Sequence, residues 1–241
     1  MKKTYVLIGN FGSGKSEISI NFALNARQED KKTVLVDLDI VNPYFRSAER
    51  KDMLEENGVK LHYPIYAMTS VEATSIPPDI YSVFIDDHET VIFDVGGDPA
   101  GAVALGQYNR NFDELESLEV LYVINCMRPL SSSVEENVEL LNAIQRTSRL
   151  TITGLINNTN LSHETTAETL LEGYDVIIEV SKITHIPVVM TVATGEVIDE
   201  FEALISKKSL DTEYIGKLYK ITRYMHINWK DTPLILCLHY A

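Results

Sequence analysis

The chain has 241 residues, of which 45% are hydrophobic and 23% are charged, as in globular proteins that bury a core without staples. Its formal net charge of −14 argues against general nucleic-acid binding, because an acidic surface repels phosphate backbones. The two cysteines form no CxxC pair, which argues against a disulfide framework or a cysteine metal site and indicates a reducing cytoplasm. The first apolar run is too short for a signal peptide or a membrane span.

Apolar runs of strand length alternate with segments of helical period along the chain. The runs are rich in Val and Ile and lack polar alternation, which is typical of strands buried on both faces of a parallel sheet. We therefore predict an α/β fold, a three-layer sandwich with a mostly parallel central sheet flanked by helices, in a single domain over 1–241. The predicted strands are Tyr5–Ile8, Val34–Val36, Val91–Phe93, Val120–Ile124, Thr151–Ile156 and Pro187–Val192. The predicted helices are Lys15–Ala26, Pro43–Asn57, Pro78–Asp87, Ala102–Leu115, Val134–Arg146 and Glu164–Lys182.

Residues 208–241 are interpreted as a C-terminal helical extension of the same domain. Within it, Tyr214–Lys230 carries four basic and no acidic residues, together with apolar residues at helical spacing. Such a helix can pack on the domain with its lysines solvated, or it can lie on an anionic membrane. The packed helix is the preferred interpretation.

A phosphate-binding loop is predicted between the first strand and the first helix, where the sequence fits G-x-x-x-x-G-K-[ST]. Glycines allow backbone N–H groups to turn toward phosphates, and the following helix offers its N-terminus to the anion. Lys15 is expected to reach the β- and γ-phosphates, and the Ser16 hydroxyl to hold Mg²⁺. The alternative is a glycine-rich turn with no ligand. The predicted nucleotide-binding residues here are Gly9, Asn10, Phe11, Gly12, Ser13, Gly14, Lys15, Ser16 and Glu17.

Two carboxylates, Asp37 and Asp39, follow the second predicted strand. Parallel sheets bind ligands at the carboxyl ends of their strands, so both lie at the predicted ligand edge. Either carboxylate is suited to position an attacking water or to contact the magnesium shell. Asp also favours turns, so the alternative is a pair of loop caps.

The third predicted strand ends in Asp94, followed by Gly96 and Gly97. An acid at this strand end is placed to hold Mg²⁺, the Walker B role. Two glycines leave the backbone free to approach a γ-phosphate, as in a segment that switches with the phosphate state.

The strand that begins at Gly154 ends in Asn157 and Asn158. An Asn amide donates and accepts hydrogen bonds at once, which suits a base edge, although Asn is also a common turn residue. The sequence contains no Asn-Lys-x-Asp, so a guanine-reading pocket of the usual GTPase kind is not supported.

Together these segments resemble the MinD/ParA-like ATPases of the SIMIBI class of P-loop proteins, the CobQ/CobB/MinD/ParA superfamily, over roughly residues 1–205. The resemblance implies that Asp39 orients the hydrolytic water, that Asp94-x-Gly96-Gly97 is switch II, and that Asn158 touches adenine. One departure is Asn10, which stands where most of the family has a second lysine that reaches a partner's nucleotide across a dimer. The family's metal-bridging cysteine pair is also absent.

The function predicted from these features is a cytoplasmic, magnesium-dependent ATPase that acts as a nucleotide-dependent switch for a partner protein. Its cofactors are ATP and Mg²⁺, Lys15 and Asp39 are its catalytic residues, and Asp37, Gly96 and Gly97 belong to its switch segments. A nucleotide-dependent homodimer is one possible state, which the sequence leaves undecided because Asn10 replaces the second lysine. Neither nucleic acid nor membrane is expected as a partner. The alternatives are an ATP-dependent small-molecule enzyme of the dethiobiotin synthetase or cobyrinate amidase type, and a nucleotide-binding adaptor with little turnover.

Overall fold

The computed structural model describes residues 2–39, 46–63, 78–97 and 99–225, and their strands form one sheet of eight. Every strand pairs in parallel with its neighbours, in the order β3-β2-β4-β1-β5-β6-β7-β8. This arrangement confirms the predicted α/β fold. The strands are β1 (Lys3–Gly9), β2 (Thr33–Leu38), β3 (Lys60–His62), β4 (Thr90–Val95), β5 (Leu118–Ile124), β6 (Gly154–Asn157), β7 (Val188–Thr194) and β8 (Lys217–Ile221).

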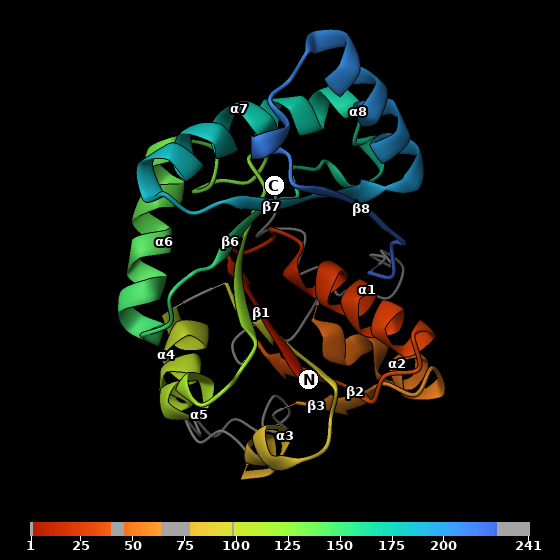
Figure 1. The fold of residues 1–241 in the computed structure, drawn as a ribbon, viewed down its shortest axis with the longest axis vertical. Coiled ribbons are helices and arrows are strands. Elements are labelled where there is room, and N and C mark those ends of the chain that lie inside the picture. Colours follow the sequence, from red (N-terminus) through yellow and green to blue (C-terminus); the bar gives the residue numbers. More distant parts are fainter. Residues whose placement is uncertain (1, 40–45, 64–77, 98, 226–241) are drawn as a thin grey trace, which may run out of the picture.

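Helices cover both faces of this sheet (Figure 1). The helices α1 and α2 lie on one face, and α4 to α8 lie on the other, so the three predicted layers are present. The α-helices are α1 (Lys15–Gln28), α2 (Lys51–Glu56), α3 (Ser82–Ile85), α4 (Pro99–Gln107), α5 (Asn109–Asp113), α6 (Val134–Ser148), α7 (Ala167–Thr184) and α8 (Gly195–Lys208). Short 3-10 helices span Ser47–Arg50, Pro78–Tyr81, Ser162–Glu164 and Thr212–Tyr214.

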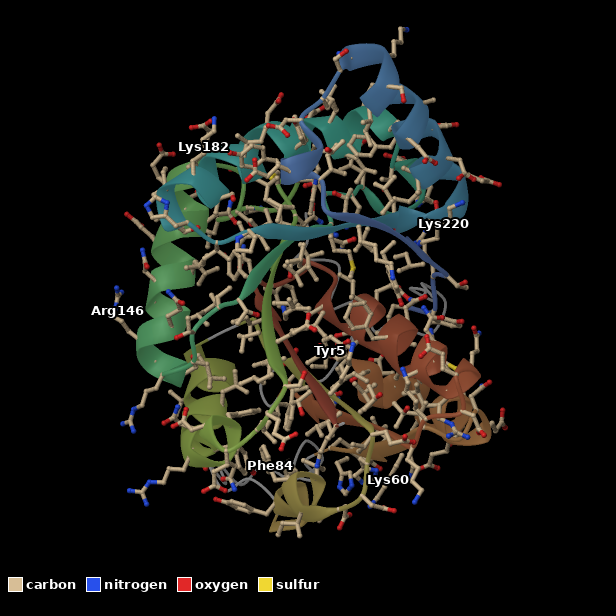
Figure 2. All side chains as sticks on the ribbon, in the orientation of Figure 1. Tyr5, Lys60, Phe84, Arg146, Lys182 and Lys220 are labelled. Atoms are coloured by element: carbon tan, nitrogen blue, oxygen red, sulfur yellow. The ribbon has the colours of Figure 1, made fainter. Side chains whose placement is uncertain are left out.

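The central strands are apolar on both sides because each side packs under helices. All six residues of β2 and all six of β4 are buried. Alternate residues of β1 face opposite layers, so that Val6 packs with α4 to α7 while Leu7 packs with α1. Figure 2 shows Tyr5 between the sheet and α1, where its ring meets Phe22 edge to face at 5.3 Å between centroids.

Side-chain caps begin α6 and α7. Ser133 caps α6, with its hydroxyl accepting the N–H of Glu136 and the Glu136 carboxylate accepting the N–H of Ser133. Thr166 caps α7, with its hydroxyl accepting the N–H of Thr169.

The prediction of a helix over Tyr214–Lys230 is wrong where the structure describes this segment, because Lys217–Ile221 is the edge strand β8. Its apolar side chains alternate between layers: Leu218 packs with α8, whereas Tyr219 and Ile221 pack on the α1 side. Pairing with β7 satisfies the backbone and overrides the helical spacing. Residues 226–241, which include the rest of that predicted helix, lie outside the described part.

The segment after β8 returns across the sheet edge to α1. Asn21 of α1 mimics a strand: its Nδ2 donates to the Thr222 carbonyl at 2.9 Å, and its Oδ1 accepts the Thr222 N–H at 2.9 Å. One turn earlier, the Glu17 carboxylate accepts the N–H groups of Tyr224 and Met225. The segment Thr222–Met225 is thereby fixed to the helix that begins at the predicted phosphate loop.

Candidate nucleotide site

The predicted phosphate loop lies between β1 and α1 at the carboxyl end of the sheet. Three of its glycines have positive φ: 147° at Gly9, 71° at Gly12 and 90° at Gly14. At Gly9 a Cβ would stand 2.4 Å from the carbonyl oxygen of Val123 on β5, so only glycine allows this approach. The loop therefore wraps closely around the start of α1, as an anion cradle requires.

Lys15 is folded into this loop. Its side chain is buried, with the residue 7% exposed, and Nζ donates to the Asn10 carbonyl at 2.9 Å. The Ser13 N–H donates to the same carbonyl at 3.2 Å. The ammonium group thus lies inside the curve of the loop, where phosphate oxygens would lie.

Asp37 and Asp94 are directly opposite each other on neighbouring strands β2 and β4. Both are buried, and their carboxylates lie on the side of α1. Burial, followed by the charge of Asp94, raises the pKa of Asp37 to about 7. Burial also raises the pKa of Asp94 to about 6, although the Ser16 hydroxyl and the Lys15 ammonium oppose that rise. The pair holds negative charge that the surrounding residues only partly compensate.

The donor set around Asp94 fits a magnesium ion. Its Oδ2 is buried and has no hydrogen-bond partner in the described part of the chain. Its carboxylate interacts with the hydroxyl of Ser16, the predicted second ligand. Mg²⁺ prefers one or two protein oxygens, which Ser16 and Asp94 can supply, and it fills its remaining positions with water and substrate phosphate.

Asp37 and Asp39 serve different parts of the site. The two oxygens of Asp37 accept the N–H groups of Asp39 at 2.9 Å and of Ala48 at 2.8 Å, which joins the end of β2 to the following turn. Asp39 lies against switch II, because a Cβ at Gly96 would stand 3.1 Å from its Oδ1. Gly97 lies against the phosphate loop, since a Cβ there would be 2.5 Å from the Phe11 nitrogen. The structure thus brings the two predicted switches and the loop together.

Asn158 and Glu17 lie beside the loop with partners of their own. The Asn158 side-chain nitrogen donates to the Ser13 carbonyl at 2.7 Å, so this residue supports the loop from below. The Glu17 carboxylate holds Tyr224 and Met225. Contact of Asn158 with a base, and of Glu17 with nucleotide, stay predictions.

Three further residues of the site are missing from the predicted set. The Ser47 hydroxyl is buried near the Asp94 carboxylate and opposes the rise of its pKa. Asn125 directly follows β5, and its Oδ1 accepts the N–H groups of Met127 and Asn160 at 3.1 Å each. Arg128 places its guanidinium beside Gly12. The strand-end rule that found Asp94 would also have pointed to Asn125, whereas no local pattern marks Ser47.

The parallel sheet and its flanking helices form the α/β fold of P-loop nucleoside triphosphatases. No family model matches the sequence, and no curated protein matches it. Among solved structures, the chain is similar to FtsY from Mycoplasma mycoides, with a TM-score of 0.54 and 15% identity over 87% of this chain and 68% of that one. It is similar to chloroplast FtsY from Physcomitrella patens, with a TM-score of 0.55 and 14% identity over 79% of this chain and 58% of that one. It is also similar to the 54 kDa signal recognition particle protein from Aeropyrum pernix, solved with GDP. That match has a TM-score of 0.53 and 20% identity, and it covers 83% of this chain and 43% of that one.

These similarities establish the fold, and the chain spans 62% of the length of one FtsY from Thermotoga maritima. They do not single out the MinD/ParA-like ATPases that the sequence resembles. In the part of the chain that the structure describes, no helix combines the length and apolarity needed to cross a membrane.

Proposed function

We propose that this protein is a magnesium-dependent nucleoside triphosphatase whose bound nucleotide controls its contact with a partner protein. The observation that carries the proposal is the convergence of Lys15, Ser16 and Asp94 at one edge of the sheet, around a loop shaped by positive-φ glycines. A buried ammonium and a buried, underpaired carboxylate in contact with one loop fit a phosphate chain and its magnesium ion.

The residues have distinct roles in this proposal. Lys15 and the N–H groups at the start of α1 neutralise the phosphates, and Ser16 with Asp94 holds the magnesium. Asp39 orients the water that attacks the γ-phosphate. The contacts of Gly96 with Asp39, and of Gly97 with Phe11, make switch II sensitive to whatever fills the loop, because a side chain at Gly97 would clash with the Phe11 backbone and one at Gly96 would crowd Asp39.

The proposed base is adenine. Guanine recognition in GTPases of the usual kind uses the carboxylate of an Asn-Lys-x-Asp motif. The chain has no such motif, and residues 157–161, at the end of β6, read Asn-Asn-Thr-Asn-Leu. Amides can pair with the adenine edge, which both donates and accepts. The similar structures of signal recognition particle proteins solved with GDP make guanine the competing outcome.

Isothermal titration with Mg-ATP, Mg-GTP and their diphosphates, followed by phosphate-release assays, tests this function. Wild type is expected to bind ATP more tightly than GTP and to release phosphate. Lys15→Ala should lose binding by at least about 100-fold, because the buried positive charge is gone. Asp39→Ala should bind ATP normally and lose turnover by about 100-fold or more.

Unchanged ATP affinity in Lys15→Ala would remove the site assignment, and full turnover in Asp39→Ala would remove the role of Asp39. A preference for GTP would reassign the base while keeping the phosphate site. Binding without turnover would indicate the adaptor function, and phosphate release only with added metabolite would indicate the small-molecule enzyme.

A further inference from the structure

The side chain of Arg128 lies directly on the phosphate loop. A Cβ built on Gly12 would stand 3.3 Å from its Nε, 3.5 Å from its Cδ and 3.7 Å from its Cζ. Gly12 is exposed and lies two residues before the helix cap Gly14. The guanidinium therefore lies beside the stretch of backbone that cradles phosphates in loops of this pattern.

The backbone that carries Arg128 is fixed to the loop. The Asn10 side chain donates from Nδ2 to the Pro129 carbonyl at 2.8 Å and accepts the Phe11 N–H at 2.8 Å. The Arg128 N–H donates to the Asn125 carbonyl at 3.1 Å, and the Ser131 N–H donates to the Arg128 carbonyl at 3.2 Å. These bonds on both sides of Arg128 make its position beside Gly12 a property of the fold.

The Arg128 guanidinium has no hydrogen-bond or ion-pair partner within residues 2–39, 46–63, 78–97 and 99–225, and its side chain is exposed. Guanidinium carries five donors in a planar fork that matches phosphate oxygens. The chain has 35 acidic and 21 basic residues, so an arginine without an acidic partner is notable at this edge. An anion at the phosphate loop would satisfy its donors.

We propose that Arg128 is a catalytic residue that contacts the triphosphate from within the same chain. This inference rests on the proposed function. In hydrolysis, water adds to the γ-phosphorus and the bond from that phosphorus to the β–γ bridging oxygen breaks, which yields nucleoside diphosphate, inorganic phosphate and a proton. Arg128 stabilises the charge that moves onto the bridging and γ-phosphate oxygens, the contribution of an arginine supplied in cis.

This arrangement gives a role to Asn10, the residue that departs from the family pattern. The family that the sequence resembles has a lysine there, which acts on a partner's nucleotide. Here Asn10 holds the turn that carries Arg128, so the same position supplies positive charge indirectly and to its own nucleotide.

Steady-state hydrolysis and diphosphate binding of Arg128→Ala and Arg128→Lys test this role, with Arg146→Ala as the control. Arg146 is exposed and projects outward from α6, away from the loop (Figure 2). Arg128→Ala should lower kcat by about 10³-fold, the lower end of arginine-finger effects, with diphosphate affinity within about threefold of wild type. Added guanidinium ion should restore part of the rate in Arg128→Ala, and Arg128→Lys should retain an intermediate rate because it keeps the charge without the fork. Arg146→Ala should match wild type.

A kcat within twofold of wild type in Arg128→Ala would overturn the inference while the proposed function stands. Parallel losses of kcat and diphosphate affinity, with no rescue by guanidinium, would reduce Arg128 to a support of the loop. A mixture of Arg128→Ala and Lys15→Ala that regains activity would show action in trans and overturn the cis assignment. Failure of wild type to bind nucleotide would remove the proposed function and this inference with it.

Discussion

Burial raises the pKa of both Asp37 and Asp94, so their ionisation lowers the stability of the folded protein. A carboxyl whose pKa is raised on folding binds its proton more tightly in the folded state than in the unfolded state. The folded state therefore loses stability as the pH rises from the unfolded value of 3.8 toward the folded value of about 6 for Asp94 and about 7 for Asp37. Magnesium and nucleotide are expected to reverse this loss at neutral pH.

Asp94→Asn should make the nucleotide-free protein more stable at pH 8. Removing a carboxylate whose pKa is raised by burial should increase the free energy of unfolding by on the order of 1–3 kcal/mol. The same variant should gain little further stability from Mg-nucleotide, because a magnesium ligand is gone. Thermal unfolding with and without Mg-ATP measures both effects.

The control for this prediction is pH 5, where Asp94 of the folded wild type is largely protonated. The stability difference between wild type and Asp94→Asn should shrink there. A difference that is equal at pH 5 and pH 8 would contradict the assigned cause.

The contact between α1 and the segment after β8 is the main element-level feature outside the sheet. Side chains at three successive turns of α1 face this segment: Glu17, Asn21 and Asn25, which bond Tyr224 and Met225, Thr222, and Tyr219 respectively. The Arg223 side chain extends this contact to Ser162 in the turn after β6, at 2.6 Å. The segment therefore joins the phosphate-loop helix to the loop predicted to meet the base.

Asn21→Ala should lower the free energy of unfolding by about 1–3 kcal/mol, because it removes a hydrogen bond to the Glu17 carbonyl and both hydrogen bonds to Thr222, whose backbone groups it leaves unpaired. Urea unfolding measures this loss. Limited proteolysis should also cut the variant faster near residue 222, since local opening there becomes easier.

Asn57→Ala is the matched control, because Asn57 is exposed at the end of α2 and makes one side-chain bond, to the Met53 carbonyl. It should cost less than about 0.5 kcal/mol, as surface substitutions do. Equal losses in the two variants would show that Asn21 is not a special anchor.

The elements predicted correctly are those with long, uniformly buried runs. The strands β1, β2, β4 and β5 read directly as apolar stretches because both of their faces are covered. The edge strands β3 and β8 were missed, since each has one neighbour and charged residues such as Lys60 and Lys217. Their identity depends on pairing with distant strands, which local pattern does not contain.

At the scale of the whole molecule, a charge supplied in cis removes one reason for two copies to meet around nucleotide. We expect the Asp39→Ala variant, which should retain triphosphate, to have the same solution mass with Mg-ATP and Mg-ADP. Light scattering measures this directly. A mass that doubles only with ATP would show a dimerising switch despite Asn10.

The candidate site was predictable where chemistry follows strand ends in sequence. Lys15, Ser16, Asp39 and Asp94 were found because their motifs are local, and the sheet order then brings them together. Arg128 was not found, because its significance lies in packing against Gly12, 116 positions earlier. The support given by Asn158 to Ser13, across 145 positions, was likewise invisible to local pattern.

The contact between Asn21 and Thr222 also sets an order of events during protein synthesis. Thr222 follows Asn21 by 201 positions, which at about 5–20 residues per second means a delay of roughly 10–40 s on the ribosome. Throughout that interval α1 carries polar side chains whose partners do not yet exist. The helix that follows the predicted phosphate loop is therefore among the first to emerge and among the last to gain all its partners, because its contacts with residues 222–225 form only after those residues have left the exit tunnel.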